Sequence, residues 1–145
     1  MSLFSLLSVS ASGMSAQRTR AELLVSNLAN SETTRTPDGG PYRRKDAVFV
    51  TSETASPFSA VFQTEVGTGV SGVGVQDIVE DQREPDKRYL PGHPDADQNG
   101  YVAFPHIDPS SEMVDLLGAS RGFQANVAAM GAVKDMLNRS IDLLR

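Results

Sequence analysis

Apolar residues recur at alternating spacings of three and four at both ends of this chain. The N-terminal stripe, so defined, contains Phe4, Leu7, Ala11, Met14, Arg18, Ala21, Val25 and Leu28. The C-terminal stripe contains Met113, Leu116, Ser120, Phe123, Val127, Met130, Lys134, Leu137, Ile141 and Leu144. This spacing keeps one line of side chains on the side of a helix that meets a partner helix, as in coiled coils. Each end of the chain is therefore predicted to be a long helix.

Local signals set the limits of these two helices. The first is expected from about residue 3 to residue 30, because residues 30–34 (NSETT) favour turns and residues 36–41 contain two prolines. Gly13 lies inside it and costs about 1 kcal/mol relative to alanine. The second helix is expected to begin sharply, with Asp108 as its N-cap and Pro109 at its first position, and to continue to Arg145.

The segment between the helices has the composition of short strands and turns. Residues 47–51 and 59–64 are β-branched and aromatic runs, and residues 73–80 alternate after a glycine-rich stretch. Residues 81–100 are polar and rich in turn formers, and residues 101–104 could form a short strand. The predicted fold class is α+β, with helical segments at 1–32 and 108–145 and a glycine- and proline-rich β domain at 33–107.

Both helices are joined to the same middle domain, one entering it and the other leaving it, so they are predicted to pair antiparallel. A two-helix pair buries only one side of each helix, and the remaining apolar surface is expected to meet other subunits. In the free monomer the ends are then expected to be partly disordered. Two interpretations of Arg18 and Lys134 stay open: they set register or partner choice, or they extend into solvent.

Composition excludes several classes of function. The net charge of −5 argues against nucleic acid as the main partner. The chain has no cysteine, so a disulfide framework, a thiolate nucleophile and a cysteine-based zinc site are excluded. No stretch reaches the roughly 18 to 20 apolar residues that span a bilayer. Residues 3–9 are apolar but lack a preceding basic region, so no cleaved signal peptide is expected.

One loop has a pattern known from calcium sites. Residues 95–100 (DADQNG) match the first half of an EF-hand loop, but the twelfth position holds His106 instead of glutamate. A polar turn is the favoured interpretation, and a small calcium-dependent binding module using Asp95, Asp97 and Asn99 is the alternative. His93 and His106 do not form a helical metal-binding pair. We therefore predict no catalytic residues, no metal site and no cofactor, and expect that the chain is not an enzyme.

Several segments together resemble the bacterial flagellar rod and hook proteins. The segments that carry the resemblance are 12–14 (SGM), 16–18 (AQR), 27–30 (NLAN), 33–34 (TT), 39–45 (GGPYRRK), 93–97 (HPDAD), 100–102 (GYV), 112–115 (EMVD), 119–121 (ASR) and 124–126 (QAN). The segments at 39–45, 93–97 and 100–102 narrow the resemblance to the proximal-rod subunits of that family. The resemblance covers nearly the whole chain and is weakest between about residues 52 and 70. The chain departs from the family pattern at His106, where asparagine is usual, and at Phe123, where tyrosine is common.

The resemblance implies a structural role. Members of this family stack helically into the drive shaft of the flagellar basal body, which transmits torque and encloses the export channel. They lie in the periplasm, and the flagellar type III apparatus exports them without a cleaved signal. The implied partners are copies of the chain, other proximal and distal rod proteins, the rod-to-ring adaptor and the membrane ring. The terminal helices would line the inner tube, and the β domain would form the outer layer. The expected subunit-packing residues are the large apolar members of both stripes: Phe4, Leu7, Met14, Val25, Leu28, Met113, Leu116, Phe123, Val127, Met130, Leu137, Ile141 and Leu144.

Overall fold

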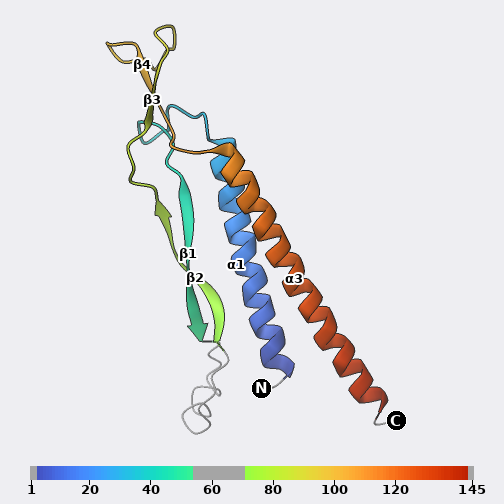
Figure 1. The fold of residues 1–145 in the computed structure, drawn as a ribbon. Coiled ribbons are helices and arrows are strands. Elements are labelled where there is room, and N and C mark those ends of the chain that lie inside the picture. Colours follow the sequence, from blue (N-terminus) through green and yellow to red (C-terminus); the bar gives the residue numbers. More distant parts are fainter. Residues whose placement is uncertain (1–2, 54–70, 144–145) are drawn as a thin grey trace.

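The computed structural model describes residues 3–53 and 71–143 of the 145-residue chain. Its elements are α1 (Leu3–Ala29), β1 (Lys45–Glu53), β2 (Ser71–Glu80), β3 (Asp86–Tyr89), β4 (Tyr101–Phe104) and α3 (Pro109–Asp142). Figure 1 shows α1 and α3 running in opposite directions, the β1–β2 pair beside them, and β3–β4 projecting beyond the end where the helices meet the strands. The α+β class and the antiparallel helix pair are as predicted. Within the described ranges, neither helix is long and apolar enough to cross a membrane.

The start of α3 follows the predicted capping chemistry. Asp108 has an extended backbone, and its side chain accepts a hydrogen bond from the backbone N–H of Ser110 at 3.0 Å. Pro109 occupies the first turn, where its missing N–H leaves no bond unmade. Glu112 follows in the same turn, where a negative charge interacts favourably with the helix dipole.

Small residues form part of the contact between α1 and α3, together with the buried Leu24 and Val133. A Cβ atom added at Gly13 would lie 3.0–3.2 Å from the side-chain atoms of Asn126, and one added at Gly122 would lie 3.2 Å from Cδ of Gln17. Ala119 is buried on the same side of α3. Glycine at these positions leaves room in the seam for the side chains of Asn126 and Gln17, which a Cβ atom would crowd.

This seam is displaced by one residue from the predicted C-terminal stripe. Glu112, Ala119 and Val133 are buried in α3, whereas Met113, Ser120 and Lys134, each one residue later, are exposed. The helices therefore pair antiparallel as predicted, but much of the stripe does not face the partner helix of its own chain. The spacing of apolar residues shows that a helix has an apolar side; it does not show that a neighbouring line of small residues allows closer packing.

The β1–β2 pair, which we call the ribbon, confirms the strands predicted at 47–51 and 73–80. Its antiparallel register pairs Lys45 with Glu80 and Glu53 with Ser71, with an irregularity after Val48. The ribbon meets α1 where the Ser12 hydroxyl accepts a hydrogen bond from the backbone N–H of Val73 at 3.0 Å. The predicted strand at 59–64 lies outside the described residues.

The β3–β4 pair confirms one predicted strand and adds a second. The strand at 101–104 is present as β4, and the polar, turn-rich segment 81–100 also contains β3, for which the sequence carries no signal. All four β3 residues are exposed, so they show no alternation that sequence patterns could detect. Pairing with β4 makes this segment a strand, supported by an edge-to-face contact between Tyr89 and Tyr101 with ring centroids 5.4 Å apart.

The small-residue seam leads to a prediction on stability. Gly122→Leu would force the leucine side chain against Gln17 and separate the helices, so we expect a loss of about 1–3 kcal/mol in the free energy of unfolding. Gly118→Leu is the matched control, because a Cβ at Gly118 has no atom within 4 Å. Thermal unfolding followed by circular dichroism compares the two variants. Equal melting temperatures would contradict the close approach at Gly122.

Candidate functional site

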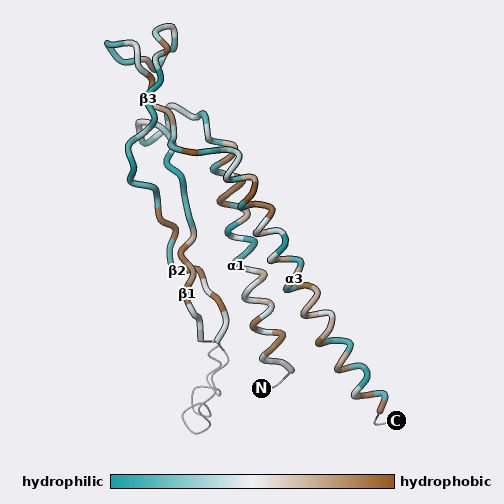
Figure 2. Tube along the Cα trace, in the orientation of Figure 1, coloured by the Kyte–Doolittle hydropathy of each residue, from teal (hydrophilic) through white to brown (hydrophobic). Residues whose placement is uncertain are grey.

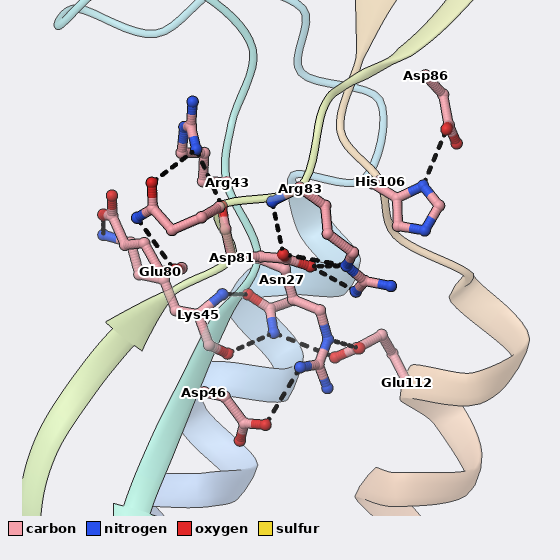
Figure 3. A network of polar contacts seen from close by, with 12 residues as sticks. Asn27, Arg43, Lys45, Asp46, Glu80, Asp81, Arg83, Asp86, His106 and Glu112 are labelled. Atoms are coloured by element: carbon pink, nitrogen blue, oxygen red, sulfur yellow. Dashed lines mark hydrogen bonds and ion pairs between the residues drawn. The ribbon is translucent and has the colours of Figure 1, made fainter.

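A buried asparagine joins α1, β1 and α3. The side chain of Asn27 is fully buried. Its Nδ2 donates to the backbone oxygen of Lys45 at 2.8 Å and to Oε2 of Glu112 at 3.1 Å. Its Oδ1 accepts from the backbone N–H of Lys45 at 2.9 Å and from the Tyr42 hydroxyl at 3.1 Å. All the hydrogen-bonding capacity of the amide is thus used, and Figure 3 shows the side chain between β1 and the start of α3.

Glu112, which accepts a hydrogen bond from Asn27, also forms an ion pair with Arg44. Its side chain is 3% exposed, and Oε1 accepts from Nε of Arg44 at 2.5 Å. Arg44 also donates to Asp46 at 3.2 Å and lies 3.9 Å from Asp115. Burial alone would lower the pKa of Arg44, but hydrogen bonds and the charges of Glu112 and Asp46 raise it above its ordinary value. The guanidinium therefore stays charged and balances the buried carboxylate.

We call Asn27, Arg44 and Glu112 the Asn27 cluster. Its members come from three segments of the chain, and Asn27 and Glu112 are separated by 85 residues. Each member forms a hydrogen bond with another member of the cluster. In the described part of the chain no buried side-chain nitrogen or oxygen lacks a hydrogen-bond partner. A buried polar group without a partner costs about 1–3 kcal/mol, so the three elements are held in one relative position.

Two further polar pairs lie next to the cluster in Figure 3. The hydrogen bonds that Arg83 donates from its side chain and backbone to Asp81 lower the pKa of the Asp81 carboxyl to about 2. His106 lies 2.8 Å from Asp86, measured from Nδ1 to Oδ1. The His106 side chain thus joins the segment before α3 to the start of β3.

Besides the Asn27 cluster, the structure has a second candidate site, an apolar groove between α1 and α3. It has a volume of about 530 Å³ and is lined by Gln17, Arg18, Ala21, Leu116, Leu117, Ala119, Ser120 and Phe123. The lining includes members of both the N-terminal and the C-terminal stripe. Arg18 and Ala21 of the N-terminal stripe thus lie beside Leu116, Ser120 and Phe123 of the C-terminal stripe along this groove. Figure 2 shows apolar residues recurring along both helices.

The predicted packing residues fall into three groups. Leu7, Met14, Leu28, Leu116, Met130 and Leu137 are half-buried. The exposed ones are Val25, Met113, Phe123, Val127 and Ile141, with exposures between 39% and 58%. The side chain of Phe4 and all of Leu144 lie outside what the structure describes. We name the exposed and half-buried members together the apolar face.

The two charged members of the stripes are also exposed. Arg18 Nε lies 2.9 Å from Oε1 of Glu22, one helical turn away, and both side chains are mostly in solvent. Lys134 is exposed as well. In the single chain these positions match the interpretation in which the charges extend into solvent.

The loop at residues 95–100 uses its carboxylates within the fold. Oδ2 of Asp95 accepts a hydrogen bond from Thr34 at 2.8 Å, and Oδ1 lies 3.8 Å from Arg35. Oδ1 of Asp97 accepts from the backbone N–H groups of Asn99 and Tyr101. Across the described residues, His, Asp and Glu side chains form no group of three or more that could hold a metal ion. The geometry is that of a polar turn and gives the calcium hypothesis no support.

Comparison with known proteins identifies the family. The family model "Flagellar basal body rod FlgEFG protein C-terminal" matches residues 98–143. The flagellar basal-body rod protein FlgC of Bacillus subtilis is 41% identical, over 99% of this chain and 99% of its own. FlgC of Escherichia coli O6:H1 is 40% identical, over 99% of this chain and 98% of its own. FlgC of Aquifex aeolicus is 38% identical, over 98% of this chain and 97% of its own. The chain belongs to the FlgC family of flagellar basal-body rod proteins.

The FlgC-type segments of the sequence include the three residues of the Asn27 cluster and part of the seam, although the seam residue Gly122 lies between two of these segments. Gly13, Gln17 and Asn27 come from the N-terminal motif segments. Glu112 and Asn126 come from the C-terminal ones, and Arg44 from the middle segment at 39–45. In the sequence these residues mark the family resemblance, but no pattern there indicates their contacts. The one sequence signal for the Asn27 cluster is Glu112, an acidic residue in the first turn of α3, four residues after the N-cap. That signal is ambiguous, because the helix dipole alone also favours an acidic residue there.

The Asn27 cluster generates a prediction on stability. Glu112→Ala would leave Arg44 without its buried partner and one Asn27 bond unmade, so the free energy of unfolding should fall by about 3 kcal/mol. Asp115→Ala is the control, since its contacts at 3.9 and 4.0 Å are partly exposed and should contribute less than about 1 kcal/mol. Urea unfolding measures both. A smaller loss for Glu112→Ala than for Asp115→Ala would contradict the role given to the cluster.

The Asp81–Arg83 pair gives a pH prediction. Because the pKa of Asp81 is lowered in the folded chain, its contribution to stability is present above its ordinary value near 3.8 and is lost as the pH falls through about 2. Arg83→Gln should raise the pKa of Asp81 toward its ordinary value, which an NMR titration of the carboxyl carbon would measure. Arg88→Gln should leave it unchanged, because Arg88 lies over the Phe104 ring instead.

Proposed function

We propose that this chain is a structural subunit of the flagellar basal-body rod, and that the apolar face of its helix pair contacts neighbouring rod subunits. The observation that carries the proposal is the position of the two stripes: members of both line one groove and remain partly open to solvent. Contiguous exposed apolar surface of this kind is typical of protein–protein contact sites. The names of the FlgC relatives support the assignment to the rod.

The further details of this role follow from family membership and from the sequence. The chain would lie in the periplasmic part of the basal body, exported by the flagellar type III apparatus without a cleaved signal. Its partners would be copies of itself, other proximal and distal rod proteins, the rod-to-ring adaptor and the membrane ring. We assign it no catalytic activity and no cofactor. Repeated contacts between different faces of identical subunits generate helical tubes, which is the geometry that a drive shaft requires.

The apolar face is the part of this proposal that a mutation can test. Phe123→Asp places a charge in the groove, where packing against another subunit would bury it without a partner. Because Phe123 is 39% exposed in the single chain, the isolated variant should fold with nearly unchanged helicity. The Phe123→Asp variant should not be incorporated into rods. The readout is motility: the variant should fail to restore it in a flagellated strain from which the gene for this protein has been deleted.

Ala132→Asp is the matched control, since Ala132 is exposed and helical periodicity places it on the opposite side of α3 from the groove. It should restore motility. Normal motility with Phe123→Asp would exclude the groove as a subunit contact, whereas loss of motility with both variants would show that charge anywhere on α3 is harmful.

A further inference from the structure

The ribbon leaves much of its apolar surface in solvent. Six β-branched side chains of its two strands are between 37% and 48% exposed: Val48, Val50, Val73, Val75, Ile78 and Val79. Figure 2 shows apolar stretches along both strands. A two-stranded ribbon also has two outer edges, and an edge with exposed apolar side chains is where a strand of another copy adds most readily.

The pairing pattern of the ribbon shows which backbone groups point outward at its edges. In an antiparallel pair, opposite residues alternate between those that bond each other and those whose N–H and C=O groups point away from the partner strand. Lys45 is of the outward kind, since both of its backbone groups bond Asn27. Two residues later in β1, Ala47 lies opposite Ile78, so this pair is of the outward kind too. Their N–H groups are the donors that an added strand would use at this level of the ribbon.

An aspartate side chain already occupies each of these two donors. Oδ1 of Asp46 accepts from the backbone N–H of Ala47 at 2.9 Å, and Oδ1 of Asp77 accepts from that of Ile78 at 2.8 Å. The β1 edge is further covered by Asn27 at its preceding outward position. On the β2 edge, the carboxylate of Asp77 takes the donor that an incoming carbonyl would need, and an added strand would bury its charge.

The strand β2 is also irregular beside Asp77. Val48 lies opposite Asp77 and Phe49 lies opposite Val75, so Gln76 has no opposite residue in β1. A bulge of this kind bends the strand and interrupts the regular row of edge groups, which is one way in which native proteins protect an edge. The bulge and the aspartate thus interrupt the same part of the β2 edge.

We propose that Asp77 closes the outer edge of β2 to strand addition by a second copy of this chain. With its carboxylate on the Ile78 N–H, two copies do not pair β2 to β2, and the exposed valines of the ribbon do not become the centre of an intermolecular sheet. Association between copies is thereby left to other surfaces. This role does not depend on which surface forms the rod contact, so it goes beyond the proposed function.

Asp77→Val tests the proposal, because valine cannot accept a hydrogen bond from the Ile78 N–H. The concentration at which half of the chains self-associate should fall about tenfold, the factor expected from roughly one additional hydrogen bond between copies. Sedimentation velocity of the full chain over a concentration series measures this value. Circular dichroism establishes beforehand that each variant is folded, and Asp77→Ala replaces the valine variant if it is not.

Glu80→Val is the matched control. It removes the same charge from the same strand and adds the same apolar side chain, but the Glu80 carboxylate pairs with the Lys45 ammonium at 3.4 Å. This variant, or Glu80→Ala beside Asp77→Ala, should associate as the parent chain does. No difference between the variants at positions 77 and 80 would overturn the proposal.

Asp77→Asn separates the hydrogen bond from the charge. Asparagine keeps an Oδ1 that can accept from the Ile78 N–H, so this variant should stay as monomeric as the parent chain. Association as strong as that of Asp77→Val would overturn the role given to the hydrogen bond.

Hydrogen exchange locates the contact between copies. In monomeric Asp77→Val the Ile78 amide should exchange faster than in the parent chain, and it should become protected as the variant associates. Association without protection of this amide would place the contact elsewhere and would also overturn the proposal. None of these measurements requires rod assembly or motility, so the closed edge and the proposed function can fail separately.

Discussion

The fold depends on one fully bonded amide. Asn27 pairs with both backbone groups of Lys45 as a neighbouring strand residue would, and it also bonds the first turn of α3 through Glu112. The ribbon has only two strands and could not maintain a fixed position by itself. A helix of 34 residues that meets one neighbour along a narrow seam has the same difficulty. The amide and the Arg44–Glu112 pair together fix both elements to α1.

Breaking such a cluster would cost free energy, because buried polar groups would lose their partners. The cluster can therefore fix the relative position of α1, β1 and α3 even though few apolar side chains are buried in the described residues. Removing Glu112 would leave Arg44 partly buried without its partner, whereas replacing exposed stripe residues would cost the single chain little. The seam, which includes Gly13, Ala119 and Gly122, holds the pair together, and apolar side chains beside it, such as Phe123 and Val127, remain exposed. If these exposed side chains are the assembly surface, as we propose, then stability and assembly use different surfaces of the same helices. A subunit arranged in this way would fold without using the surface through which it assembles.

Several features could be predicted because they rest on local chemistry. The Asp108 cap, the Pro109 start and the loop with Gly39 and Gly40, both at positive φ, depend on residues a few positions apart. The strands at 47–51, 73–80 and 101–104 have apolar and β-branched runs of their own. The strand β3 has no such run, and its state is decided by pairing with β4, a partner that lies about a dozen residues later.

The sequence by itself determined that both ends are helical, that each carries an apolar stripe, and that the chain belongs with the flagellar rod proteins. It could do so because helix caps, spacing and family motifs are written in neighbouring residues. Only the tertiary structure decided which side of each helix meets the other, because the choice between the apolar stripe and the residues next to it depends on which side chains of the partner helix fit against them. It also revealed the Asn27 cluster, whose members have no common signature until folding brings residues 27, 44 and 112 together. The physical reason is the same in both cases: a seam and a buried polar cluster are properties of pairs of distant residues, and a periodic pattern describes one helix at a time.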